Sequence, residues 1–177
     1  MKFQRVLIAA ALAAVISSPA LADNTNTTTP STDTSVERNV DQQQRIEQGL
    51  DSGQLTTREA GKLEQGETRI EKTEARDMKD GSLSPAEQAR LNKMQNNESK
   101  AIYSQKHDAQ TGNPESVSSE RMQKDVQRNV YQQQRINQGV NSGSLTTKET
   151  GRLERGQARN TRLEAGAARN GRINARE

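Results

Sequence analysis

Apolar residues recur at helical spacing in three segments of the first half of the chain, and polar turns separate these segments. The apolar positions are Val36, Val40, Ile46 and Leu50, then Ala60, Leu63 and Ile70, then Leu91, Met94, Ile102 and Tyr103. Each set falls near one face of an α-helix, as in helices that cover a core. Gly53 and Gly81 follow the first two segments and favour the left-handed backbone of a helix end. Because helices joined by short turns pack as antiparallel neighbours, the pattern predicts an all-α protein of antiparallel helical hairpins.

This helical pattern occurs twice in the sequence. "RNVDQQQRIEQGLDSGQLTTREAGKLEQG" begins at Arg38 and "RNVYQQQRINQGVNSGSLTTKETGRLERG" begins at Arg128, an offset of 128 − 38 = 90 positions. The alignment continues without gaps to Glu177, which corresponds to Glu87 at the start of the third predicted helix. The second unit therefore lacks this helix. We interpret the sequence as truncated, with loss of the last helix from the second unit as the alternative.

The N-terminus has the pattern of a signal peptide. Lys2 and Arg5 precede an apolar run over residues 6–16, and the small residues of "ALA" over 20–22 provide a cleavage site. The run is shorter than the roughly 20 apolar residues of a membrane-spanning helix. We therefore expect an exported protein, periplasmic or secreted, that is cleaved near Ala22 and has no transmembrane segment in its mature chain.

The segment after the cleavage site is polar and threonine-rich and offers nothing to bury, so we expect it to be disordered. The predicted parts are a signal peptide (1–22), a disordered polar lead-in (23–35), a first three-helix repeat unit (36–107), a linker (108–119) and a second repeat unit without its last helix (120–177).

The composition predicts a thin core. Apolar residues make up 29% of the chain, against roughly 45–50% in globular domains. The chain has no cysteine, so disulfides cannot compensate in an oxidising compartment. Such a chain forms a thin helical assembly, stays partly disordered or depends on a partner. We expect a protein partner or self-association. A short seam in the second unit has the spacing for this, and its residues are Val126, Val130, Ile136 and Val140.

Three predicted turns pair a hydroxyl with a glutamate. In "LTTREA", "LSPAEQ" and "LTTKET" a Thr or Ser stands three residues before a Glu. This is the pattern of a capping box, in which each side chain bonds a free backbone N–H of the other residue. The predicted pairs are Thr56 with Glu59, Ser84 with Glu87, and Thr146 with Glu149.

The turn "DGSLSPAE" admits a second interpretation, as half of a calcium-binding loop. With Gly81 at the sixth position of an EF-hand loop, Asp80 falls at the fifth and Glu87 at the twelfth. The first and third positions, however, hold an arginine and a methionine in place of oxygen ligands. Helix capping is therefore the favoured interpretation, and no cofactor is required. The alternative is weak binding of Ca²⁺ or another divalent cation at Asp77, Asp80 and Glu87.

Three segments carry a resemblance to a known family. "QQQRIEQGLDSGQLTTREAGKLE", "DGSLSPAEQARLNKMQ" and "SKAIYSQKHDAQ" resemble a family of small exported proteobacterial proteins. Its members share Gly-x-Leu-Thr-x-x-Glu turns, which are similar to degenerate EF-hands, and a closing Lys-His-Asp/Asn segment. The resemblance covers residues 38 to about 110 and the second copy. It implies a helical repeat and export, and it implies no reaction.

Charge distinguishes the two halves of the chain. Without Lys2 and Arg5 the formal charge of +3 becomes 3 − 2 = +1, and the excess of basic residues lies in the second unit. Five arginines recur there at helical spacing, at Arg152, Arg155, Arg159, Arg162 and Arg169. A solvated face is the favoured interpretation, and binding of an anionic polymer or lipid is the alternative. No aromatic residue follows Tyr131, so sequence-specific binding of nucleic acid is not expected.

The sequence shows no catalytic constellation. His107, beside Asp108, is the single histidine, whereas a zinc site needs three or four ligands and acid–base catalysis needs a positioned partner in a pocket. We therefore predict a non-catalytic, exported interaction or structural protein of the cell envelope. The alternatives are a weak divalent-cation binder or metal-stress protein, and an anionic-polymer binder.

Overall fold

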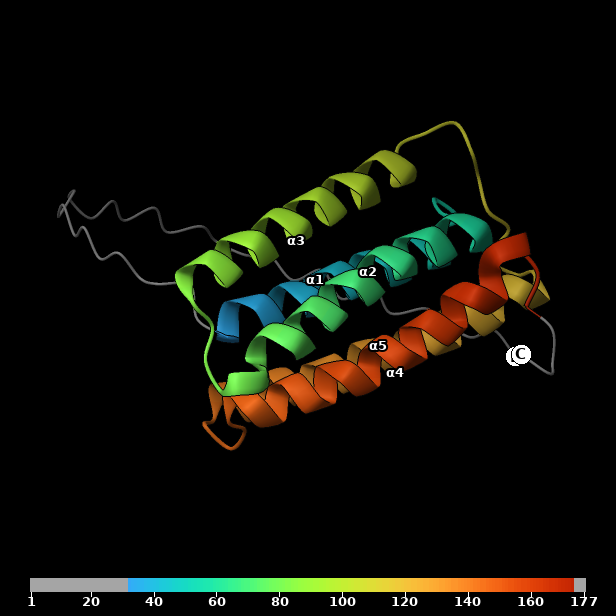
Figure 1. Cartoon of the computed structure of the whole chain (residues 1–177). Coiled ribbons are helices and arrows are strands. Elements are labelled where there is room, and N and C mark those ends of the chain that lie inside the picture. Colours follow the sequence, from blue (N-terminus) through green and yellow to red (C-terminus); the bar gives the residue numbers. More distant parts are fainter. Residues whose placement is uncertain (1–31, 174–177) are drawn as a thin grey trace, which may run out of the picture.

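The structure is a computed structural model that describes residues 32–173 (Figure 1). These residues form α1 (Thr32–Asp51), α2 (Thr57–Asp77), α3 (Pro85–Lys106), α4 (Val117–Asn141) and α5 (Thr147–Ala167), with 3₁₀ turns at Met78–Asp80 and Ala168–Asn170. The predicted all-α class with antiparallel helical hairpins is confirmed. Within the described part of the chain, every helix is too short or too polar to cross a bilayer. The predicted signal peptide, residues 1–22, lies outside the described residues.

Helix α1 begins earlier than the apolar pattern indicates. It starts at Thr32, inside the segment 23–35 that we expected to be disordered. Tertiary contacts of the helix begin at residue 35. Ser35 and Val36 are buried, and the main-chain oxygen of Ser35 accepts a hydrogen bond of 2.8 Å from Gln95 of α3.

Helix α4 also begins earlier than expected, at Val117 inside the predicted linker 108–119. The side chain of Ser116 accepts a hydrogen bond from the backbone N–H of Ser119, which is an N-cap. The linker is therefore shorter than predicted, and the second unit gains a turn of helix at its start.

The same local signals start and stop the equivalent helices of both units. Capping boxes begin α2, α3 and α5, at Thr56 with Glu59, Ser84 with Glu87, and Thr146 with Glu149. The turns after α1 and α4 contain Gly53 and Gly143, whose φ angles are 72° and 69°. Side chains rarely adopt this left-handed backbone, so glycine is the suitable residue.

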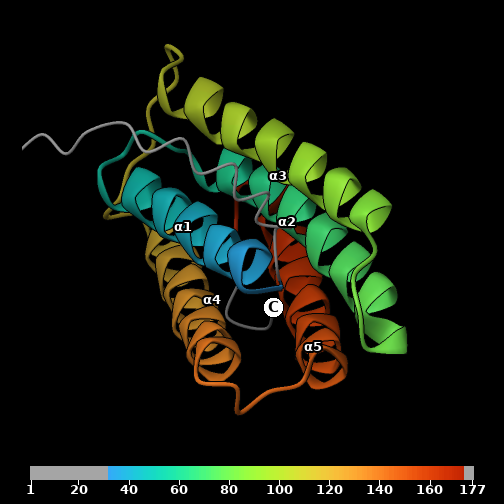
Figure 2. The same ribbon diagram turned by 90° about the vertical axis from the view of Figure 1, so that its left-hand side faces the viewer.

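The two repeat units face each other with their helices antiparallel (Figure 2). α1 lies beside α4, and α2 lies beside α5. A Cβ atom on Gly61 would lie 2.6 Å from the Cβ of Ala168, and one on Gly151 would lie 2.8 Å from the Cβ of Met78. These two pairs exchange under the 90-position offset of the repeat, so the contacts are reciprocal, as across a twofold axis. Glycine at both crossings lets α2 and α5 approach closely.

Helix α3 packs against α1 and α2 on the side away from α4 and α5 (Figures 1 and 2). It therefore covers the first unit, and no described helix covers the equivalent face of the second. The main apolar cluster is formed by Ile46, Leu50, Leu55, Ala60, Leu63, Ile102, Met122, Val126, Ala168 and Ile173. Val126 and Val130, which we predicted in a self-association seam, are buried within the chain.

Candidate binding groove

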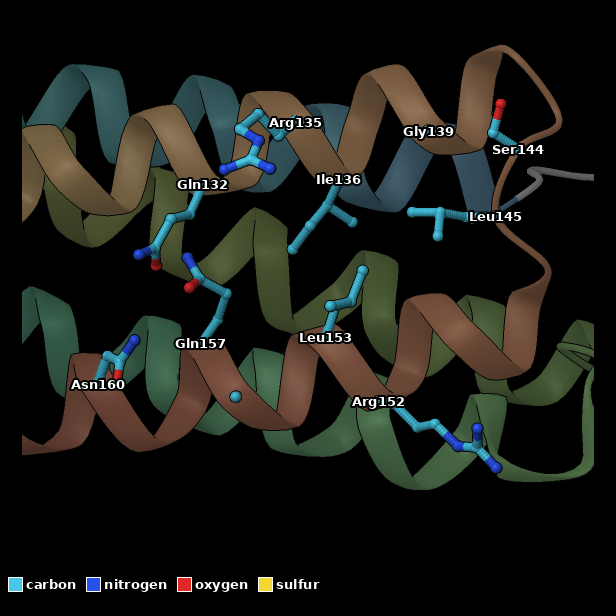
Figure 3. Close-up of a pocket in the computed structure, with 11 residues that line it drawn as sticks. Gln132, Arg135, Ile136, Gly139, Ser144, Leu145, Arg152, Leu153, Gln157 and Asn160 are labelled. Carbon is cyan, nitrogen blue, oxygen red and sulfur yellow. The ribbon is translucent and has the colours of Figure 1, made fainter.

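A groove of about 520 Å³ lies between α4 and α5 on the surface of the second unit (Figure 3). Ile136 of α4, Leu153 of α5 and Leu145 of the connecting turn point into it. Leu145 is held by Gly139, on which a Cβ atom would lie 2.6 Å from the leucine Cδ1. The groove therefore has an apolar end near the turn.

In the first unit, α3 fills the equivalent position. The carboxamide of Gln42 donates to the hydroxyl of Ser99 at 2.9 Å, and Arg45 donates to the main-chain oxygen of Ser99 at 3.1 Å. The residues at the equivalent positions of α4 are Gln132 and Arg135, and both line the groove. The groove thus corresponds to the surface of the first unit that α3 covers.

Exposure of equivalent residues shows the same relation. Leu63 is 3% exposed, whereas its counterpart Leu153 is 43% exposed. Gly66 is buried beneath the carboxylate of Glu98, whereas its counterpart Gly156 is exposed and a Cβ atom on it would meet nothing within 4 Å. The second unit keeps the leucine and the glycine that suit a covering helix.

One buried polar atom also marks the position of this helix. In the first unit, Asn39 Oδ1 accepts a hydrogen bond of 2.7 Å from Gln95 of α3. Its counterpart, Asn129, is 1% exposed, and its Oδ1 has no hydrogen-bond partner. A buried acceptor without a donor costs free energy, and a helix placed like α3 would supply the donor.

The groove is polar and basic away from the turn. Gln132 and Gln157 point toward each other across it (Figure 3), and Asn160 stands where the first unit has the buried Ile70. Arg135 and Arg152 are exposed at its edges. A ligand for this groove therefore needs an apolar part, polar groups that can hydrogen bond, and a tolerance for positive charge.

The interface between the units contains a row of carboxyl groups, which we call the carboxyl ladder. It consists of the buried Glu64, Glu67, Glu71 and Glu74 of α2, the buried Glu154 of α5 and the half-buried Glu164 of α5. Burial raises the pKa of Glu67 and Glu71 well above the ordinary value of 4.5, and the neighbouring carboxyl groups add to this. Burial likewise raises the pKa of Glu74 and of Glu164 to about 7. Protonated carboxyl groups are therefore the form that the fold favours.

Amide side chains hold the ladder in the same way in both units. Gln43 donates to Glu64 at 3.2 Å and Gln133 donates to Glu154 at 3.0 Å. The pairs Asn39 with Glu74, at 2.7 Å, and Asn129 with Glu164, at 2.5 Å, follow the same pattern. The sequence analysis missed these residues because it considered only apolar positions as candidates for burial. The signal available in the sequence is that these glutamate, glutamine and asparagine positions are identical in the two copies.

The three carboxylates predicted as a divalent-cation site have other partners. Asp77 is buried and forms an ion pair with Arg90. Asp80 accepts a hydrogen bond of 3.0 Å from the backbone N–H of Ser82, and Glu87 accepts one of 2.9 Å from the backbone N–H of its helix cap. In the described residues, no group of three or more His, Cys, Asp or Glu is arranged to hold a metal ion. Cation binding at these residues stays a prediction.

The five arginines of the predicted anion-binding stripe are all exposed. Arg152, Arg155, Arg159 and Arg162 lie on α5, and Arg169 lies in the 3₁₀ turn that follows. The ring of His107 stacks on that of Tyr103, with centroids 4.1 Å apart, at the end of α3. The histidine thus lies far along the chain from the arginines and contributes to a helix end.

In comparisons with known proteins, the chain matches no family model, no curated protein and no solved structure. Its function is therefore argued from its own geometry.

Proposed function

We propose that this protein is a non-catalytic helical interaction protein of the cell envelope, and that it binds a protein partner in the groove between α4 and α5. The observation that supports this most directly is the difference between equivalent residues: Leu63 is covered by α3, whereas Leu153 is 43% exposed. The N-terminal sequence pattern supports placement in the envelope.

The groove offers a partner three kinds of interaction. Covering Leu153 and its apolar neighbours removes hydrocarbon surface from water, which favours binding. Asn129 Oδ1 provides a buried acceptor, and Arg135 and Arg152 provide positive charge at the edges. The partner is therefore a protein segment with apolar, hydrogen-bonding and acidic groups.

Thiol protection in cells tests this proposal. The chain has no cysteine, so Leu153→Cys introduces a single reactive thiol in the groove. Leu163→Cys is the matched control, because Leu163 lies on the same helix, is 60% exposed and is not in the groove. Alkylation by a small maleimide is compared between cells that produce the full chain and the purified full chain.

We expect alkylation of the Leu153→Cys chain to be at least several-fold slower in cells than after purification, with no such change for Leu163→Cys. Equal alkylation of both variants in both settings would contradict the proposal, because the groove would then be empty where the protein works.

The exposed arginines support a second candidate function, the binding of an anionic polymer or lipid. All five side chains are exposed and could reach phosphate groups. Binding of lipopolysaccharide micelles to the full chain should weaken steeply as salt increases, and Arg155→Gln with Arg162→Gln should weaken it further. Lys72→Gln with Lys93→Gln removes the same charge from exposed positions on α2 and α3 and serves as the control; equal loss in both double variants would contradict an arginine-specific site.

A further inference from the structure

The internal repeat also indicates what kind of segment fills the groove. We propose that the groove between α4 and α5 binds an amphipathic α-helix of a separate partner protein, which runs parallel to α4 and places a glutamate over Gly156 and a carboxamide beside Asn129. This inference rests on the proposed function and specifies the partner's chemistry. Its template is α3, which packs on α1 and α2 of the first unit (Figure 2).

The direction of the bound helix follows from contacts of α3. Arg38, early in α1, donates to Asn92, and Lys106, at the end of α3, donates to the main-chain oxygen of Arg45. α3 therefore runs parallel to α1. It runs antiparallel to α2, because Arg90 pairs with Asp77 while Glu98 lies over Gly66. Under the repeat, the bound helix runs parallel to α4 and antiparallel to α5.

The glutamate is the most specific element of the pattern. In the first unit, a Cβ atom on Gly66 would lie 1.8 Å from a carboxylate oxygen of Glu98, so glycine is what admits this side chain. Burial raises the pKa of Glu98 to about 7, and the positive charge of Arg69 acts against this rise. The second unit keeps both features, with an open Gly156 and with Arg159 at the position of Arg69.

The carboxamide and the apolar residues complete the pattern. Gln95 donates to Asn39 in the first unit, and Asn129 presents the same acceptor without a donor. Toward the turn, Ile136 and Leu153 face the groove (Figure 3), so the C-terminal half of the bound helix carries aliphatic residues, as α3 does at Ile102.

The partner helix differs from α3 in one respect. Ile70 lies between the α2 residues that contact Arg90 and Glu98, so the middle of α3 covers it, and it is 1% exposed. Its counterpart is Asn160. The partner helix therefore places a polar residue against Asn160.

A second copy of this chain does not suit the groove. The described residues contain one α3 and two helix pairs that such a helix could cover, α1 with α2 and α4 with α5. An exchange of α3 between copies would fill one groove and empty another, with no net gain in contacts. The proposed partner helix carries acidic flanks, because Arg135 and Arg152 border the groove.

A peptide of residues 84–107 with capped ends serves as the probe, because it carries the glutamate and the carboxamide of the pattern. Its binding to the full chain is measured by fluorescence anisotropy. We expect saturable binding that Gly156→Leu weakens roughly tenfold or more by filling the space above the glycine. Gly166→Leu is the matched control, since Gly166 also lies on α5 with open space around it but outside the groove. Circular dichroism establishes that both variants remain folded.

The contacts of the glutamate and the direction of the helix have separate readouts. A peptide with Glu98→Lys should bind roughly tenfold more weakly or worse, because it opposes Arg159 and cannot fit over Gly156. For direction, Gln132→Cys in the chain should form a disulfide with a peptide carrying Ser99→Cys, the equivalent of the contact between Gln42 and Ser99. A peptide carrying Asn92→Cys should not crosslink at this position.

The outcomes separate this inference from the proposed function. No saturable binding below about 1 mM, or equal binding to the Gly156→Leu and Gly166→Leu chains, overturns the inference, since the peptide would then use no groove or another one. If the Leu153→Cys thiol is nevertheless protected in cells, the proposed function stands with a different kind of occupant. If residues 6–16 of the chain itself fill the groove, deletion of 1–22 will create peptide binding that the full chain lacks, and this too overturns the inference.

Discussion

The two repeat units carry nearly the same helices and turns, yet within residues 32–173 a third helix covers only the first. Leu63 of the first unit is 3% exposed and Leu153 of the second is 43% exposed, although both follow a capping box at the same distance. The difference shows that burial of a residue in this repeat depends on the presence of α3 and not on the local sequence. The second unit keeps the side chains of a covered surface and exposes them.

The paired helices α2 and α5 differ in a second way. α2 contributes four buried glutamates to the carboxyl ladder, whereas α5 has Gln157 and Thr161 at two of the equivalent positions. Thr161 donates a hydrogen bond of 3.3 Å to Glu71. Gln157 and Thr161 of α5 therefore reduce the number of carboxyl groups that face the glutamates of α2. The first unit holds most of the ionisable groups of the interface.

The largest expected effect is a loss of stability as pH rises. The ladder carboxyl groups and Glu98 have raised pKa values in the folded chain, about 7 for Glu74, Glu98 and Glu164, and near 4.5 when unfolded. Stability is therefore greatest below about pH 4.5 and falls as pH rises toward and through about 7, because the unfolded chain ionises first. Chemical denaturation should show the free energy of unfolding falling by about several kcal/mol between pH 5 and 8.

Glu67 tests the origin of this pH dependence, since both of its carboxyl oxygens are buried without partners. It faces Glu64, Glu71 and Glu74 of α2 and Glu98 of α3. Glu67→Gln should reduce the slope by about 1.4 kcal/mol per pH unit, and the reciprocal Gln157→Glu should increase it. Stability that is flat or rising between pH 5 and 8 in the unaltered chain would disprove the role of the ladder.

The next largest effect is a difference in the loss of stability when the equivalent leucines of the two units are truncated. Leu63→Ala removes a buried side chain and leaves a cavity, at a cost of about 2–5 kcal/mol. Leu153→Ala removes a half-exposed side chain and should cost less than about 1 kcal/mol. Urea denaturation at one pH measures both, and equal losses would mean that the groove is closed in the isolated chain.

Substitution of the two glycines where α2 and α5 cross should lower the stability by similar amounts in both units. Gly61→Ala places a methyl group against Ala168, and Gly151→Ala places one against Met78, at 2.6 and 2.8 Å between Cβ atoms. Each should cost about 1–3 kcal/mol because the neighbouring Cβ atoms cannot rotate away. A large loss in one variant only, measured by thermal unfolding, would contradict the reciprocal packing of α2 and α5.

The smallest expected effect is an increase in stability. Gly156→Ala should stabilise the free chain by about 0.5–1 kcal/mol, because alanine is the better helix former and nothing lies within 4 Å of the new methyl group. Gly66→Ala should gain less than this or lose stability, since the methyl group displaces the Glu98 carboxylate. Identical shifts of the midpoint in both variants would show that Glu98 does not occupy this space.

Local features of the fold were predictable because they depend on nearby residues. The capping pairs Thr56 with Glu59 and Thr146 with Glu149 act within one helical turn, and Gly53 and Gly143 adopt left-handed backbone within a short turn. The start of α1 was not predictable, because Ser35 is held by Gln95, which is 60 positions away. The groove was predictable only as the absence of a third helix from the second unit.

The sequence by itself determined the helices, their turns and the twofold repetition, since periodicity and capping are properties of short segments. Only the tertiary structure decided that α2 pairs with α5 and that α3 covers one unit. It also decided that Glu64 and Glu74 are buried, against the usual preference of glutamate for the surface. The physical reason is that a carboxyl group is admitted to an interior only where its neighbours favour its neutral form, and those neighbours come from other helices.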